Sequence, residues 1–142
     1  MNEAEQAILR VVEAYKAAVF AKDVDAFVAL YDQEVCVFDL WGTWSYHGVA
    51  AWRGMVTEWF SSLGTERVVV AMEGVHTIVA HDAAVVHAFV SYTGVSAEGN
   101  AVRTMQNRLT WALTQHAGAW TIVHEHSSAP VDPATSTVIL QR

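Results

Sequence analysis

The spacing of the apolar residues changes along this chain, and the change falls at Gly64. Before Gly64, apolar side chains recur mostly every three or four residues, the period of a helix that buries one face. After Gly64, they occur in runs and alternations that have the length and period of β-strands. A chain that is mainly helical first and mainly extended afterwards predicts an α+β fold, with helices packed on an antiparallel sheet.

Three helices and one strand are expected before Gly64. The second helix begins after Asp23, a residue type that caps helix N-termini, and the third ends where Gly64 can adopt the left-handed conformation. Between these two helices, residues 35–40 have the β-branched and aromatic composition of a strand. The first helix buries a stripe made of Ile8, Val11, Val12, Tyr15 and Val19. The third buries a stripe made of Val49, Trp52, Val56, Trp59, Phe60 and Leu63.

Long strands account for the rest of the chain. They span residues 68–79, 83–92, 103–113 and 120–127. Gly74, inside the first of them, predicts a β-bulge. We expect the sheet to curve strongly around the three helices, as a conical barrel with a pocket at its open end. The chain is then one domain, residues 1–142, with a core of about residues 5–132 and a C-terminal tail, residues 133–142.

Charge and cysteine content exclude several classes of protein. The net charge is −7, and no basic cluster is present to neutralise phosphates, so a nucleic-acid partner is excluded. No apolar run is long enough to cross a bilayer, so no membrane partner is expected. The N-terminal segment is acidic where a signal peptide is basic, and Cys36 is the only cysteine. These features predict a cytoplasmic protein.

Asp39 is a carboxylate on a face that should be buried. It follows Val35 and Val37 in the alternation of its strand, so its side chain is expected to point toward the core. Burial raises the pKa of a carboxyl group toward the range that suits a general base. The alternative is that Asp39 ends the strand by accepting backbone hydrogen bonds from the turn at Gly42.

Histidines form a second group of candidates. His124 and His126 are two residues apart in a strand, so they are expected on the same face as Trp120 and Ile122. That placement suits a structural pair, a catalytic or substrate-orienting pair, or two metal ligands completed by Asp39 or His87. His87 itself lies in an apolar strand, where a core role and a functional role both remain open.

Several further side chains are expected to contact a ligand. Asn107 interrupts an apolar strand face, and it either bridges strands or offers a hydrogen bond in the pocket. Trp41 and Trp44 lie in the loop after Asp39, and they either line a pocket or cover a subunit interface. The complete expected set of substrate-binding residues is Phe38, Trp41, Trp44, Trp52, Asn107 and Trp111.

One part of the chain resembles the ketosteroid isomerases. The resemblance runs without a gap from Tyr15 through Asp23-Val24-Asp25-Ala26 and Leu30-Tyr31 to Val37-Phe38-Asp39, followed by Gly48. It implies that Tyr15 donates a hydrogen bond to the substrate oxyanion and that Asp39 shuttles the proton. Ketosteroid isomerase is a well-known case in which the protein environment tunes the pKa values of carboxyl groups. The third catalytic acid of that family falls near Leu109, which cannot donate a hydrogen bond.

A closer resemblance, over roughly residues 5–132, is to the SnoaL-like proteins of bacteria, in the nuclear transport factor 2-like superfamily. It rests on Phe38-Asp39, on Gly48 with Ala51-Trp52-Arg53, and on the ending from Trp120 to Pro130 with its H-x-H-x-S-x-P pattern. The resemblance implies a conical α+β fold of the cystatin-like roll type, a hydrophobic pocket, and a homodimer packed through the sheet. The superfamily includes isomerases, cyclases, dehydratases, epoxide hydrolases and members that only bind or oligomerise.

Three hypotheses follow. The first is an acid–base enzyme of the isomerase, cyclase or lyase type that needs neither cofactor nor metal and acts on a small hydrophobic, cyclic or polyketide-like substrate. Asp39 would be its base, and His124 or His126 its acid or oxyanion donor. Tyr15 and His87 would be supporting donors. The second is a non-catalytic module that binds a small molecule or dimerises, and the third is a metal-dependent lyase or hydrolase.

Overall fold

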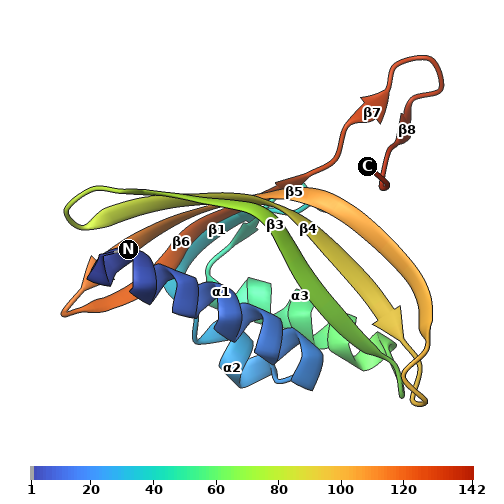
Figure 1. The fold of residues 1–142 in the computed structure, drawn as a ribbon, viewed down its shortest axis with the longest axis horizontal. Coiled ribbons are helices and arrows are strands. Elements are labelled where there is room, and N and C mark those ends of the chain that lie inside the picture. The colour runs from blue at the N-terminus through green and yellow to red at the C-terminus, as the bar shows by residue number, and fades with distance from the viewer. Residues whose placement is uncertain (1) are drawn as a thin grey trace.

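Three helices lie on the concave face of one curved sheet in the computed structural model, which describes residues 2–142 (Figure 1). The helices are α1 (Glu3–Ala21), α2 (Val24–Val28) and α3 (Val49–Ser62). The strands of the sheet are β1 (Tyr31–Phe38), β2 (Tyr46–His47), β3 (Arg67–Val79), β4 (Ala83–Val95), β5 (Ala101–His116) and β6 (Ala119–Ser128). A separate hairpin of β7 (Val131–Asp132) and β8 (Thr137–Val138) follows. The predicted α+β class and the curved sheet are confirmed.

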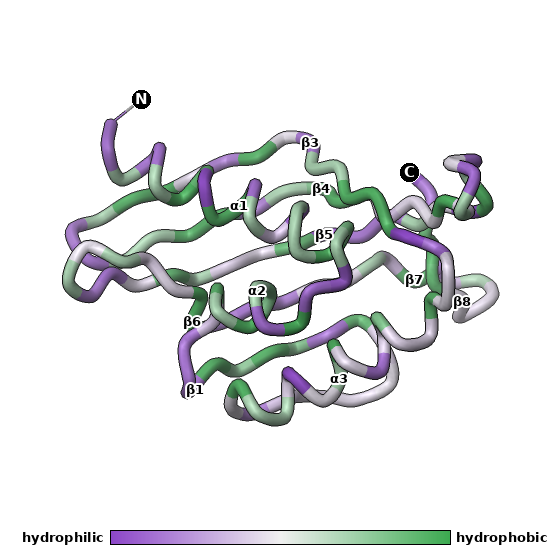
Figure 2. The backbone as a smooth tube through the Cα atoms, turned by 90° about the horizontal axis from the view of Figure 1, so that it is seen from below, coloured by the Kyte–Doolittle hydropathy of each residue, from purple (hydrophilic) through white to green (hydrophobic). Residues whose placement is uncertain are grey.

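The helices begin, end and pack as their sequence signals predict. All five residues of the expected α1 stripe are buried. Asp23 caps α2 by accepting a hydrogen bond from the backbone N–H of Ala26 at 3.0 Å. Gly64 follows the end of α3 with φ at +59°, the left-handed conformation that glycine adopts without strain. Seen from the helix side, α1 lies toward β3 and α3 toward β1 (Figure 2). Among residues 2–142, no helix combines the length and the apolar content that crossing a membrane requires.

The sheet places the first strand of the chain beside the last long one. Its order is β2-β1-β6-β5-β4-β3, and every neighbouring pair is antiparallel except β1 with β6. The structure has β1 from Tyr31 to Phe38, earlier than the expected residues 35–40, so Asp39 lies just beyond the end of the strand. The parallel pairing brings Asp39 next to the C-terminal end of β6.

Within residues 2–142, bulges interrupt the long strands at Gly74, Val102 and Val123. The predicted bulge at Gly74 is confirmed, because the β3–β4 register shifts between Glu73 and His76. The bulge at Val123 was not predicted. On β5, Leu113 pairs with Ile122 and Ala112 pairs with His124, so Val123 has no partner in the β5–β6 ladder.

The bulge at Val123 changes which side chains of β6 point toward the helices. Before it, Trp120 and Ile122 are buried; after it, the buried residues are Glu125 and Ser127. The expectation that His124 and His126 share the Trp120 and Ile122 face is therefore wrong, because one extra residue reverses the alternation.

Residues 133–142, the predicted C-terminal tail, contribute no side chain to the buried hydrophobic cluster of residues 2–142. The β7–β8 hairpin projects away from the body of the molecule (Figure 1). The last residues return along β5, where the Gln106 backbone N–H donates to the Leu140 carbonyl at 2.7 Å. Arg142 covers the ring of Phe89 on the outer face of the sheet, with 3.8 Å between its guanidinium carbon and the ring centre.

Candidate functional site

A cavity of about 520 Å³ lies between the helices and the inner face of the sheet. This volume is in the range of small-molecule sites. Most of its wall is apolar, formed by Phe27, Trp41, Tyr46, Trp52, Met55, Trp59, Leu63, Val68 and Met105. Its polar residues fall into two sets: Tyr15, Asp39, Tyr92, Asn107, Glu125 and Ser127 in the wall, and Glu58, Arg103 and Thr104 with exposed side chains. The cavity can therefore hold an apolar body and address it with a few polar groups.

Asp39 lines this cavity from the segment that follows β1. Ser127 Oγ donates to Asp39 Oδ1 at 3.2 Å and accepts from the Leu40 backbone N–H at 2.9 Å. Burial raises the pKa of Asp39, and hydrogen bonds from Ser127 and from the amides of Trp41 and Leu40 partly oppose that rise. The environment is that of a base, and the bonds to Ser127 and the backbone also fit a residue that ends a strand.

Glu125 is the most deeply buried carboxyl group of the site, with an exposed fraction of 3%. Its Oε1 atom accepts hydrogen bonds from the Tyr31 hydroxyl at 2.5 Å and from Trp111 Nε1 at 2.9 Å. Burial raises the pKa of Glu125 to about 7; the two hydrogen bonds oppose the rise, and the charge of Asp39 adds to it. The cavity therefore contains two carboxyl groups of different environments, a pattern that separates an acid from a base.

Tyr15 and Tyr92 form a hydroxyl pair in the same wall. Their oxygens are 2.9 Å apart, and either one could be the donor. Burial is the main cause that raises the pKa of both phenols, so both stay protonated at neutral pH. Two hydroxyl groups have two hydrogens and use one between them, so the second can be donated to another oxygen.

Within residues 2–142, two buried polar atoms of the cavity wall lack a hydrogen bond of ordinary geometry. They are Trp52 Nε1 and Asn107 Oδ1, on residues that are 2% and 8% exposed. Leaving such atoms unpaired costs free energy, so native proteins rarely do it without a reason. Small rearrangements around a bound polar molecule would satisfy them, which fits a binding site better than an inert core.

The three predicted histidines do not line the cavity. His124 and His126 lie on the outer side of β6 against Phe38, with ring centres 4.9 and 5.6 Å from the Phe38 ring. His124 Nδ1 is also 2.7 Å from the Cys36 carbonyl oxygen. His87 is exposed, 5.1 Å from the ring of His76. Within residues 2–142, no three His, Cys, Asp or Glu side chains gather as metal ligands would.

The predicted ligand-binding residues divide between three places. Trp41, Trp52 and Asn107 line the cavity together with Asp39 and Tyr15. Trp111 is fully buried and contacts the site from behind, through its hydrogen bond to Glu125 and its edge contact with the Tyr15 ring, whose centre is 5.4 Å away. Phe38 and Trp44 border a second hollow, between the loop after β1 and the C-terminal end of β6; Asp39, His126 and Ser127 border it too.

Three residues of the polar group, Tyr92, Glu125 and Ser127, escaped the sequence patterns. A signal for Tyr92 was present, because it continues the inward alternation of Val86, Ala88 and Val90. Glu125 and Ser127 could be placed only with the bulge known, since without it their strand positions point outward.

Comparisons with known proteins agree with this geometry. A family model described as the SnoaL-like domain matches residues 8–132. No curated protein sequence matches significantly. An NTF2-like protein of unknown function from Pseudomonas putida KT2440 superposes with a TM-score of 0.85 and 22% identity, over 98% of this chain and 95% of that one. Aln2 from a Streptomyces species superposes with a TM-score of 0.82 and 12% identity, over 90% and 91%. A putative aromatic ring hydroxylase from Novosphingobium aromaticivorans superposes with a TM-score of 0.69 and 21% identity, over 90% of this chain and 91% of that one. At identities this low, the superpositions establish a common fold, and they do not establish a common reaction.

Proposed function

Since the chain belongs to the SnoaL-like domain family, we propose that it is an acid–base enzyme that moves a proton on a small hydrophobic cyclic or polyketide-like ketone. No cofactor takes part in the proposed reaction. The observation that carries the proposal is the joint presence, in one cavity, of Asp39 with a raised pKa and the Tyr15–Tyr92 hydroxyl pair. A carbonyl compound needs those two functions to lose a proton from the carbon next to its carbonyl group.

Asp39 is the base in this proposal. Its ionised carboxylate takes the proton from carbon, and its raised pKa makes it a stronger base than an exposed aspartate. Ser127 holds the carboxylate in position through the hydrogen bond to Oδ1. When the enolate takes the proton back on a different carbon, the product is an isomer. When the enolate instead expels a leaving group from the neighbouring carbon, the outcome is elimination. When its carbon attacks a second carbonyl group of the same molecule, the outcome is cyclisation.

The tyrosine pair stabilises the oxyanion that forms as the proton leaves. One hydroxyl hydrogen of the pair is used in the hydrogen bond between Tyr15 and Tyr92, and the second is donated to the substrate oxygen. The hydrogen bond within the pair strengthens the hydroxyl group that donates to the substrate. Glu125 is the acid of the site, because a carboxyl group with a pKa of about 7 keeps a large protonated fraction at neutral pH. This assignment replaces the histidines of the sequence-based hypothesis, which lie outside the cavity.

Deuterium uptake tests the proposal. The bicyclic ketone 2-tetralone is incubated in D₂O with the wild type, with Asp39→Asn, and with Asp82→Asn as a control at an exposed turn. The wild type and the control should accelerate uptake next to the carbonyl, and Asp39→Asn should lower the rate by about 10²–10⁴-fold, the usual contribution of a general base. Equal uptake by Asp39→Asn and the wild type would show that Asp39 is not the base.

The non-catalytic binding module remains the second candidate, favoured by the hydrogen bonds that satisfy Asp39 as a strand-ending residue. It predicts that 2-tetralone raises the melting temperature of the wild type without any accelerated deuterium uptake. Substitution of the cavity wall, for instance Trp52→Ala, should then abolish that rise in melting temperature.

A further inference from the structure

One cationic side chain lines the cavity. Among residues 2–142, it is Arg103, near the start of β5; the other charged or acidic residues of the wall are Asp39, Glu58 and Glu125. Arg103 and Asn107 lie four residues apart on the inner side of β5, which corresponds to about 13 Å of strand. Asp39 thus lies near one end of the cavity and the guanidinium near the other, with Tyr92, which pairs with Met105 on β5, between them.

The fold makes room for this guanidinium on the inner face. Gly94 pairs with Arg103 across the β4–β5 ladder. A Cβ atom at Gly94 would lie 3.6 Å from Arg103 Cζ and 3.5 Å from Glu66 Oε1. Any longer side chain at position 94 would therefore occupy the space that the arginine and its partner now use. The absence of a side chain at Gly94 lets Arg103 fold back over the strand toward the cavity.

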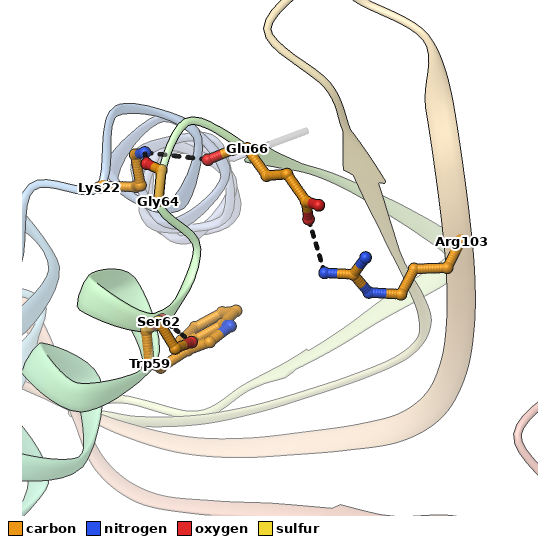
Figure 3. A network of polar contacts seen from close by, with 6 residues as sticks. All are labelled: Lys22, Trp59, Ser62, Gly64, Glu66 and Arg103. Carbon is orange, nitrogen blue, oxygen red and sulfur yellow. Dashed lines mark hydrogen bonds and ion pairs between the residues drawn. The ribbon is translucent and has the colours of Figure 1, made fainter.

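Glu66 orients the guanidinium. Arg103 Nη2 donates to Glu66 Oε1 at 2.6 Å, across the opening between the start of β3 and β5 (Figure 3). The segment that presents Glu66 is itself fixed, because Lys22 Nζ donates to the carbonyl oxygens of Gly64 at 2.8 Å and of Glu66 at 2.9 Å. Trp59, on α3, forms part of the same cavity wall as Arg103, and Ser62 Oγ donates to its carbonyl oxygen at 2.6 Å (Figure 3).

The ion pair leaves most of the guanidinium unused. An arginine side chain has five N–H donors, and within residues 2–142 the structure gives that of Arg103 one acceptor, Glu66. The Arg103 side chain lines the cavity and is 63% exposed, so its remaining donors are open to water or to a ligand that fills the cavity. A planar fork of donors matches a carboxylate, which it binds through two parallel hydrogen bonds.

We propose that Arg103 binds a carboxylate on the ligand, so that the cavity takes keto acids whose ketone and carboxylate lie at opposite ends of an apolar ring system. This inference rests on the proposed function for the ketone and on Arg103 alone for the carboxylate. Glu66 holds the guanidinium in place when the cavity is empty, and it competes with the ligand for the same donors.

Binding of two matched probes tests the inference. They are 2-tetralone-6-carboxylate and 2-tetralone-6-carboxamide, which have the same ring system and differ in charge. Titration calorimetry at low salt should show that the wild type prefers the carboxylate by about tenfold, since the carboxylate alone adds the attraction of opposite charges and two parallel hydrogen bonds to the guanidinium. Arg103→Gln should abolish this preference, and Glu66→Gln should increase it because the competing carboxylate is gone.

Arg53→Gln is the matched control, because it removes the same charge from the outer side of α3, where Arg53 pairs with Asp25. It should keep the wild-type preference. A preference that survives Arg103→Gln, an equal loss in Arg53→Gln, or no carboxylate binding by the wild type at millimolar concentration would each overturn the inference. These titrations need no turnover, so a failure of Asp39-dependent deuterium uptake would refute the proposed reaction while leaving the carboxylate result to be judged separately.

Discussion

Glutamine in place of Glu125 should change how the stability of the fold depends on pH. The pKa of Glu125 is raised from 4.5 to about 7 in the folded protein. Between these two values the folded state keeps a proton that the unfolded state has already released, so the free energy of unfolding falls as the pH rises. The difference between the two pKa values, at about 1.4 kcal/mol per pH unit, corresponds to a loss of about 3 kcal/mol in the free energy of unfolding between pH 4.5 and pH 7. Glu125 is 3% exposed, so solvent screens little of this effect.

Glutamine keeps an oxygen that can accept from Tyr31 and Trp111, and it cannot ionise. Urea unfolding of both proteins at pH 5, 6, 7 and 8, at constant ionic strength, gives the comparison. The two should have similar stability at pH 5, and the variant should be more stable than the wild type by about 3 kcal/mol at pH 8. Glu98→Gln, in the exposed turn between β4 and β5, controls for the substitution itself. Parallel stability curves for the wild type and the Glu125 variant would refute the reasoning.

Further predictions concern the neighbours of that carboxyl group and the outer face. Trp111→Phe removes a hydrogen bond that favours ionised Glu125, so the pH-dependent loss of stability should extend to higher pH in the same urea titrations. Tyr92→Phe should lower the kcat of deuterium uptake by about 100-fold with a smaller change in KM, as loss of an oxyanion donor does. Deletion of Val123 should turn Glu125 outward and destabilise the fold by about 4 kcal/mol or more, measured by chemical denaturation. The homodimer that we expect through the sheet would cover Phe89, which is 41% exposed, so Phe89→Glu should give monomers in native mass spectrometry.

Elements with local signals could be predicted from the sequence. The α1 stripe, the Asp23 cap and the bulge at Gly74 each depend on residues that are close together in the chain, and the structure contains all three. The cavity positions of Asp39 and Tyr15 also agree with the expected directions of their side chains. Their roles remain predictions, because a position in a cavity does not by itself show a reaction.

The bulge at Val123 could not be predicted because no glycine or proline marks it. Hydrophobicity does not choose the register either: after Ile122, both alternations of the strand carry polar residues, histidines in one and Glu125 with Ser127 in the other. The choice is made by tertiary contacts, since Glu125 accepts hydrogen bonds from Tyr31 and Trp111 on two neighbouring strands. A pattern read along one strand does not contain that information.

β1, the first strand of the chain, lies between β2 and β6 and pairs in parallel with β6. Its second edge is therefore paired only after β6, the last long strand, has been made. Ser127 reaches Asp39 across 88 positions of sequence. Pairings over such distances form late, because a long loop must close before they exist. At synthesis rates of about 5–20 residues per second, the ribosome needs roughly 5–20 s to make the chain between these two strands. During that interval the edge of β1 that β6 later covers is unpaired, and an unpaired strand edge can pair with another chain.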